Sequence, residues 1–268
     1  MEYPKEIVPE YLAGSSTVAL SKKYGFHYSS IRSYLIRNGV TLRSNKVNSK
    51  KYKADDRAFE VIDTEEKAYW LGFLYADGYV SSTNGKRIGL ALSTKDYKHL
   101  EKFKSFLNSD YPISVYTSSG YSNTEYCRMI ITSEKMYDDL VSHGVVEHKT
   151  NVLEYPYWLD SDLQKHFLRG YIDGDGCITN NGSSYAVKIM GTDGFLDGVV
   201  RFLTNAQAYT YGSRAQRNSE CDVKCLNLFG KTAFNTITLT YGESHIYLDR
   251  KFDRATEAIR YFSRLYQQ

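Results

Sequence analysis

Two acidic residues, ninety-eight positions apart, end two stretches of nearly the same pattern. Residues 70–78 read WLGFLYADG and residues 168–176 read LRGYIDGDG. Each stretch is an apolar run with helical spacing that closes on an acid, Asp77 or Asp175, followed by glycine. The C-terminal end of a helix carries the negative end of the macrodipole, where a carboxylate is disfavoured. A chain that places an acid there twice indicates a compensating cation.

Small residues recur four positions apart in both runs; these are Gly72, Ala76, Gly170 and Gly174. Residues four apart share a helix face, so each run presents a smooth strip that another backbone can approach closely. If the two strips face each other, the two acids meet, and close carboxylates are typical of a divalent cation site. Gly78 and Gly176, which follow the acids, are included in the predicted metal site and are expected in the left-handed conformation that ends many helices.

These residues resemble the helix for which the LAGLIDADG homing endonucleases are named. Both copies keep the first glycine, the final acid and the glycine after it, whereas Tyr75 replaces the inner acid that the second copy keeps as Asp173. In the family that inner position is not the metal ligand. A calcium loop also begins D-x-D-G, but it needs oxygen ligands at regular spacing, and Cys177 and Ile178 follow instead. Two copies at domain-sized spacing match the two-motif, monomeric type.

The resemblance implies an α+β fold with two tandem αββαββα domains, whose antiparallel sheets form a saddle over the DNA major groove. It implies a site-specific endonuclease that makes double-strand breaks with short 3′ overhangs by metal-dependent hydrolysis. Two or three Mg²⁺ ions would be held at the paired acids, with Mn²⁺ substituting and Ca²⁺ supporting binding without cleavage. The expected partner is double-stranded DNA with a long, near-asymmetric target site. Two other classes stay open: an intron maturase that binds intron RNA, and a non-cleaving, sequence-specific DNA-binding regulator.

Two lysines follow the expected final helix of each half. Lys149 lies seventy-two residues after Asp77, and Lys251 lies seventy-six after Asp175. The family carries a basic residue near the active site at these places, so both are catalytic candidates that could stabilise the pentacovalent phosphate. The alternative for each is an exposed loop lysine. The family also often has a polar residue at the end of the second strand; here Thr94 and Gly191 stand there, so the two sites are expected to be chemically unequal.

The elements that must position these residues follow the same order in both halves. Asp63 or Thr64 can cap the first motif helix. Strand patterns then occur at 79–80, 87–92, 113–117 and 126–132, with helices at 97–107 and 134–143. The second half has strand patterns at 177–178, 185–190, 209–213 and 223–229, helices at 195–203 and 231–240, and a C-terminal helix.

Antiparallel sheets of this kind are covered by helices on one face and open on the other. Basic residues on or near the strands are the predicted DNA contacts, although each could equally be an ordinary surface charge; these are Lys86, Arg87, Arg128, Lys188, Arg214, Arg217 and Lys224. The twenty-five tyrosines suit the same use in part, because phenolic hydroxyls donate hydrogen bonds to phosphates and base edges.

The N-terminal segment is basic. Residues 1–53 hold ten Lys and Arg against three Glu, a net charge of +7 that leaves −4 for the remainder of a chain whose total is +3. This asymmetry indicates contact with a polyanion. Apolar spacing at Leu20 and Tyr24, then at Ile31 and Leu35, with Gly25 between the pairs, predicts a helix-turn-helix supported by a first helix at residues 7–12.

The segment resembles resolvase-type helix-turn-helix domains, in which the start of the second helix faces base edges. The candidates for recognition are His27, Tyr28, Ser29, Ser30, Arg32 and Ser33, and Arg43 and Lys46 in the linker could follow a phosphate backbone. The alternative is a three-helix cap that packs on the body. The predicted domains are therefore a helix-turn-helix at 1–42, a basic linker at 43–62, and LAGLIDADG domains at 63–155 and 156–268.

Bulk composition agrees with these expectations. The apolar fraction of 42% is ample for a core in a chain of 268 residues, and the four cysteines lack the spacing of a zinc site. We find no signal peptide and no apolar run long enough to span a membrane, so we expect a soluble, intracellular protein that is not secreted. The two-motif resemblance implies that it is a monomer.

Overall fold

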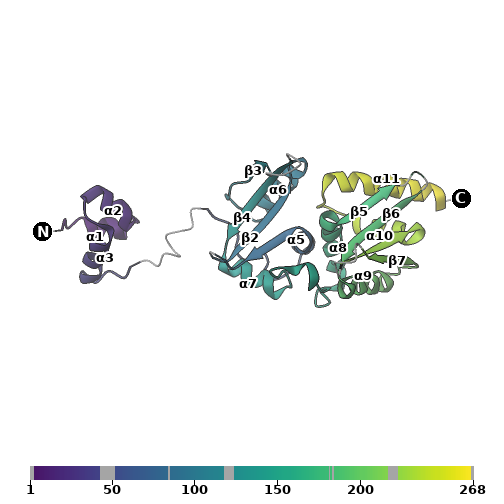
Figure 1. Cartoon of the computed structure of the whole chain (residues 1–268), viewed down its shortest axis with the longest axis horizontal. Helices are drawn as coiled ribbons and strands as arrows, with labels where there is room; N and C mark the ends of the chain where they lie inside the picture. The colour runs from purple at the N-terminus through teal and green to yellow at the C-terminus, as the bar shows by residue number, and fades with distance from the viewer. Residues whose placement is uncertain are drawn as a thin grey trace. The chain divides into compact units, whose positions relative to one another are not determined.

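The computed structural model describes residues 3–42, 52–83, 85–117, 124–180, 182, 184–216 and 223–266. The chain forms two compact units, Met1–Tyr52 and Lys53–Gln268 (Figure 1). Each unit is described by itself.

The described part of the first unit contains the helices α1 (Ile7–Leu12), α2 (Thr17–Tyr24) and α3 (Tyr28–Arg37). The Ser16 hydroxyl caps α2, and Gly25 ends it with a φ of 73°, a left-handed conformation that favours glycine. The three helices share an apolar core of their own, formed by Ile7, Tyr11, Leu20, Ile31 and Leu35. The predicted helices are therefore present, and Leu12, the last residue of α1, is exposed.

The described residues of the second unit form two four-stranded antiparallel sheets of the same topology. The first has the order β1-β2-β4-β3, and its strands are β1 (Gly78–Ser81), β2 (Arg87–Ser93), β3 (Ser114–Thr117) and β4 (Glu125–Thr132). The second has the order β5-β6-β8-β7, and its strands are β5 (Gly176–Asn180), β6 (Tyr185–Gly191), β7 (Gly212–Gln216) and β8 (Lys224–Phe229). The repeated order confirms the tandem α+β fold.

Helices cover one face of each sheet (Figure 1). The first half contains α5 (Glu65–Ala76), α6 (Tyr97–Phe106) and α7 (Glu134–Ser142), with short 3-10 turns at Thr94–Asp96 and Lys149–Asn151. The second contains α8 (Ser161–Asp175), α9 (Asp193–Asn205), α10 (Gly230–Tyr241) and α11 (Asp249–Tyr266). Strand residues alternate accordingly: Ile88, Leu90 and Leu92 of β2 are buried under the helices. None of the described helices is long and apolar enough to cross a membrane.

Two predicted segments differ from the structure by three residues or more. Strand β7 begins three residues later than predicted, because the amides of Thr210 and Tyr211 both donate to the Thr232 hydroxyl, at 3.0 Å, instead of to a neighbouring strand. The predicted linker 43–62 is also too long. Residues 53–62 belong to the second unit, where the Asp55 amide donates to the Leu107 carbonyl at 2.7 Å and Phe59 is fully buried.

Candidate active site

Helices α5 and α8 meet along their small residues at the centre of the second unit (Figure 1). A Cβ atom on Gly72 would lie 2.0 Å from the Phe167 carbonyl oxygen, and one on Gly170 would lie 2.0 Å from the Tyr69 carbonyl oxygen. These two approaches are related by the same ninety-eight-residue offset as the motifs. The two helix backbones are therefore in direct contact, and no side chain fits between them at these positions.

The contact brings the ends of the two helices together. Asp77 is the C-cap of α5 and Asp175 is the last residue of α8, and both side chains are exposed. A Cβ on Gly174 would lie 2.3 Å from the Ala76 Cβ and 3.5 Å from Asp77 Oδ2, so the Asp77 carboxylate reaches the residue that precedes Asp175. The surrounding protein displaces part of the solvent around Asp77 and Asp175 adds repulsion, which together raise the pKa of Asp77 to about 6.

The two glycines after the acids do not adopt the predicted left-handed conformation. Asp77 ends α5 with helical torsions, and Gly176 is extended, with φ −91° and ψ 173°. Both glycines are needed because each begins a strand that lies directly against the end of the preceding helix. A Cβ on Gly78 would lie 2.7 Å from the Leu74 oxygen, and one on Gly176 would lie 2.7 Å from the Ile172 oxygen. Glycine thus lets the chain turn directly from the helix into the strand.

Both predicted lysines lie beside these helix ends. The Lys149 ammonium donates to the Gly78 carbonyl from a short 3-10 turn and is half-buried. Lys251 lies in the first turn of α11 rather than in a loop, is buried, and donates to four backbone carbonyls around the end of α8. Burial lowers the pKa of both lysines, and the nearby carboxylates oppose that shift.

The residues at the helix ends fit a hard divalent cation. Their donors are carboxylate oxygens, which Mg²⁺ prefers, and repulsion from the Asp175 carboxylate adds to the effect of burial in raising the pKa of Asp77. Among the described residues no group of three or more His, Cys, Asp and Glu side chains could hold a metal. Asp77 and Asp175 would therefore share an ion with oxygens from outside the protein, as Mg²⁺ commonly does with water and phosphate.

Three of the predicted basic contacts lie on the open sheet faces. Arg87 and Arg128 alternate with the buried residues of β2 and β4, and Lys188 does so in β6. The Arg128 guanidinium lies 5.0 Å from the centre of the Tyr116 ring on β3, which stacks in turn on Tyr126. The open face of the first sheet therefore presents cations and aromatic rings together.

Three others differ from the prediction, because they lie on the helix-covered side and are paired with acids. Lys86 donates to Asp138 of α7. Arg214 contacts Asp193 and Asp197 of α9, and Lys224 contacts Asp193 at 2.5 Å. Alternation explains the placement, since Arg214 is opposite the buried Leu226 in the β7–β8 register. Arg217, Arg43 and Lys46 lie outside the described residues.

The predicted inequality between Thr94 and Gly191 rests on a wrong correspondence. Leu90 is opposite Gly78 in the first sheet, and Ile189 is opposite Gly176 in the second, so the second strands differ by ninety-nine positions. Gly191 therefore corresponds to Leu92 on the buried side, where a Cβ would lie 2.8 Å from the Phe195 ring. The Thr94 hydroxyl donates to the Glu125 carbonyl, at 3.4 Å, and has no such relation to Gly191.

In the first unit, the predicted recognition residues gather at the start of α3. His27, Tyr28, Ser29, Arg32 and Ser33 are exposed, Ser30 is half-buried, and His27 Nδ1 lies 2.7 Å from the Ser29 hydroxyl. This surface is polar and belongs to the second helix of the α2–turn–α3 pair.

The structure also identifies residues that the sequence patterns did not single out. Asn227 of β8 is opposite Lys188 on the open face of the second sheet, and Tyr79 of β1 lies across Gly89 on the first. Strand alternation would have found both. Arg169, 1% exposed inside the second motif helix, joins the two halves by donating to Glu65 at 2.7 Å. The sequence signal that could have identified Arg169 is its position as a charged residue within an apolar helical run.

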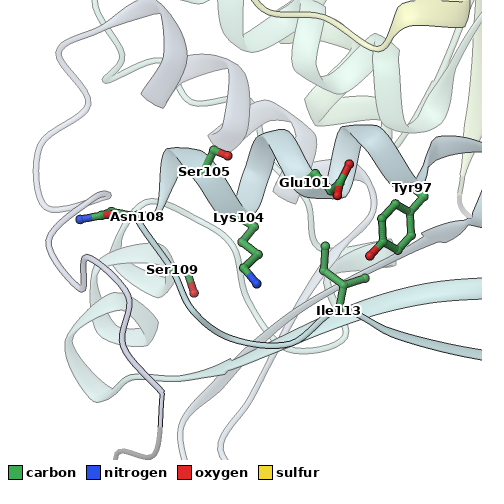
Figure 2. Close-up of a pocket in the computed structure, with 7 residues that line it drawn as sticks. All are labelled: Tyr97, Glu101, Lys104, Ser105, Asn108, Ser109 and Ile113. Carbon is green, nitrogen blue, oxygen red and sulfur yellow. The ribbon is translucent and has the colours of Figure 1, made fainter.

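A separate hollow lies on α6 and the turn that follows it (Figure 2). It is lined by Tyr97, Glu101, Lys104, Ser105, Asn108, Ser109 and Ile113. None of the predicted site residues lines it, so we do not assign it to the carboxylate site.

Comparisons with known proteins agree with this fold. Residues 64–139 match the family model of the LAGLIDADG-like domain. The homing endonuclease I-WcaI, solved bound to its DNA recognition sequence, is similar with 14% identity and a TM-score of 0.50, covering 82% of this chain and 95% of its own. The I-LtrWI LAGLIDADG homing endonuclease, bound to target DNA, has 15% identity and a TM-score of 0.50, covering 76% and 92%. No curated protein matches the chain.

Proposed function

Residues 64–139 are a LAGLIDADG-like domain and the second unit has the tandem LAGLIDADG fold, and from this premise we propose that the chain is a DNA endonuclease. The observation that carries the proposal is the meeting of Asp77 and Asp175 at the adjoining ends of α5 and α8. One chain supplies both carboxylates, so a monomer can present a complete site. The reaction is hydrolysis of one phosphodiester in each strand of double-stranded DNA.

The protein's own residues would bind the metal ion, fix the spacing of the two acids and place a cation beside them. Asp77 and Asp175 would bind Mg²⁺, which when bound neutralises charge on the phosphate and lowers the pKa of water. The direct packing of α5 on α8 fixes the spacing of the two acids, because the two helix backbones are in contact at Gly72 and Gly170. Lys149 adds a cation beside them that can donate to a phosphate oxygen.

The open sheet faces are the proposed DNA-binding surface. Arg87 and Arg128 on the first sheet and Lys188 with Asn227 on the second supply donors at positions that the helices leave uncovered. Arg and Lys recognise guanine and phosphate, whereas Asn pairs with adenine. Because the two faces present different side chains, we expect an asymmetric target site.

The proposal is tested by selecting DNA from a random-sequence library in Ca²⁺ and incubating the selected sites with Mg²⁺. We expect enrichment of a long asymmetric sequence and cleavage of both strands within it. Enrichment without cleavage in Mg²⁺ or Mn²⁺ would favour a non-cleaving DNA-binding regulator. Preference for RNA over the selected DNA would favour a maturase.

Alanine substitutions on the two sides of the sheets test the placement of the DNA. Arg128→Ala and Lys188→Ala are each expected to weaken binding to the selected site and to reduce the salt dependence of binding by about one phosphate contact. Lys86→Ala and Lys224→Ala remove the same charge from the helix-covered side and are the matched controls. Equal losses from both pairs, measured by salt titration of the affinity, would contradict the assignment of the open faces.

We also propose that the first unit is a helix-turn-helix DNA-binding domain that reads bases with the start of α3. Deleting residues 1–52, the whole unit as the fold divides the chain, should lower affinity for the selected DNA and flatten its salt dependence, because phosphate-binding cations are lost. The remaining unit keeps its own core and should retain some cleavage at high enzyme concentration. Unchanged affinity with an unchanged salt slope would mean that the first unit does not bind DNA.

A further inference from the structure

The two lysines beside the carboxylates have different hydrogen-bonding states. Lys251 Nζ donates to the carbonyl oxygens of Ile172 and Asp173, both at 2.7 Å, and of Gly176 at 2.8 Å, with that of Gly174 at 3.2 Å. An ammonium has three N–H donors, so the backbone of the α8 terminus occupies all of them. The carbonyls of Asp173 and Gly174 lie in the last turn of α8, where no later amide of the helix reaches them, whereas the Ile172 carbonyl also accepts from the Gly176 amide. Lys251 binds this end of the helix from inside the protein, where it is 7% exposed.

Lys149 differs from Lys251 in its hydrogen bonds and in its burial. Within the described part of the chain its Nζ has one hydrogen-bond acceptor, the Gly78 carbonyl, which corresponds to the Gly176 carbonyl bound by Lys251. It is half-buried rather than buried. Two of its three donors therefore remain for a water molecule or a phosphate oxygen.

The difference follows from the position of the inner acid, at which the two motifs diverge. Asp173 is 1% exposed and accepts hydrogen bonds from the Tyr69 and Tyr241 hydroxyls, at 2.8 and 2.7 Å, and from the Leu248 amide at 2.7 Å. It thereby ties α8 to the start of α11 and places a buried carboxylate near the buried ammonium of Lys251. A buried charge is tolerated when an opposite charge and hydrogen bonds accompany it.

At the corresponding position the first half has no carboxylate. Tyr75 stands at the corresponding position, and its hydroxyl donates to the His143 carbonyl. Lys149 accordingly stays closer to solvent, with a single backbone contact. The substitution of tyrosine for aspartate in the first motif thus accompanies a change in the state of the neighbouring lysine.

We propose that Lys251 is a positioning residue that caps α8 and fixes Asp175, whereas Lys149 keeps donors for the reaction, so that the two DNA strands are cut at unequal rates. The strand-rate part of this inference rests on the proposed endonuclease function. The capping part does not, because it concerns the fold.

Acylation of the intact protein tests the capping assignment without any cleavage assay. Wild-type protein is treated with a small amine-reactive acetylating reagent at low dose, and modification of each lysine is followed over time by mass spectrometry. Lys149 should react at least about ten-fold faster than Lys251, because a fully hydrogen-bonded, buried ammonium offers no free amine. Asp173→Asn should raise the reactivity of Lys251. Tyr75→Phe, the matched change in the first half, should leave the reactivity of Lys251 unchanged.

Stability supplies a second readout. Lys251→Met leaves carbonyls at the end of α8 unsatisfied, so Tm should fall by at least about 5 °C, whereas Lys149→Met should change Tm by less than about 2 °C. The fall in Tm of the double variant Lys251→Met/Asp173→Asn should be smaller than the sum of the falls for the two single variants. The reason is that the double variant removes both charges and leaves neither one buried without its partner. If Lys251→Met does not fold at all, the wild-type acylation rates still decide the assignment.

Strand-resolved cleavage of the selected DNA completes the test. Wild-type protein should cut one labelled strand faster than the other, and Lys149→Met should slow one strand by about 100-fold or more and so change the ratio of the two rates. Lys251→Met should slow both strands by a similar factor and leave the ratio near its wild-type value. Rapid acylation of Lys251 in the wild type, or an unchanged Tm with loss of one strand in Lys251→Met, would overturn the proposal. If wild-type protein cuts no DNA, the endonuclease function fails, and the acylation and Tm results still stand for or against capping.

Discussion

Replacing Asp77 or Asp175 with Asn is expected to abolish cleavage of at least one DNA strand, while binding to the same DNA in Ca²⁺ persists. Each change removes one of the two carboxylates that meet at the helix ends, and an amide binds a hard divalent ion poorly. Loss of the charge that holds such an ion is expected to slow cleavage by at least about 100-fold. The measurement is the single-turnover rate for each labelled strand, with binding measured separately.

Protein stability separates a lost ligand from a damaged fold. The pKa of Asp77 is raised to about 6, above that of an unfolded aspartate, so its ionisation opposes folding as the pH rises through this range. Asp77→Asn removes that repulsion, and in the absence of metal its Tm above pH 6 should equal or exceed that of the wild type. Asp253→Asn, at an exposed position on α11, is the control and should change neither cleavage nor Tm. Full activity on both strands in either single active-site variant would contradict the site.

Gly170→Leu is expected to have the second largest effect, because it places a side chain inside the contact between α5 and α8. Even its Cβ would lie 2.0 Å from the Tyr69 carbonyl oxygen, a backbone atom that cannot move aside without moving the helix. Overpacking typically costs about 1–3 kcal/mol, and the clash with a backbone atom puts this case at the upper end, which corresponds to a fall in Tm of roughly 6 °C or more. The two carboxylates should separate as the helices splay, so cleavage of both strands should fall with stability.

Gly194→Leu provides the matched control. Gly194 lies in the first turn of α9, and a Cβ there would meet nothing within 4 Å. This variant adds the same side chain and the same change in helix propensity without entering a packed contact. Equal Tm values and equal cleavage for Gly170→Leu and wild type would contradict the paired-helix arrangement.

Much of the fold could be predicted from local patterns. The Thr64 cap, the apolar runs ending at Asp77 and Asp175, and the alternating strands all carry their signal within a few residues. The pairing of the motif helices could be predicted as well, because glycine and alanine at four-residue spacing leave few other uses for that face.

The errors arose where long-range contacts decide the outcome. Whether Lys86 or Lys224 lies on the open or the covered face depends on strand register, which one residue of displacement reverses. Lys251 was expected near the site, but its role as a cap depends on α11 starting beside the end of α8. Gly78 was expected to be left-handed, whereas the strand begins directly against the helix. None of these placements is encoded in residues adjacent in the sequence.

The most direct test of the central claim compares wild-type protein with the double variant Asp77→Asn/Asp175→Asn on the selected DNA, with each strand labelled. We predict that in Mg²⁺ the wild type cuts both strands at one place and the double variant cuts neither, while both proteins bind the DNA equally in Ca²⁺. Cleavage by the double variant, or a wild type that binds tightly and cuts neither strand in Mg²⁺ or Mn²⁺, would contradict it.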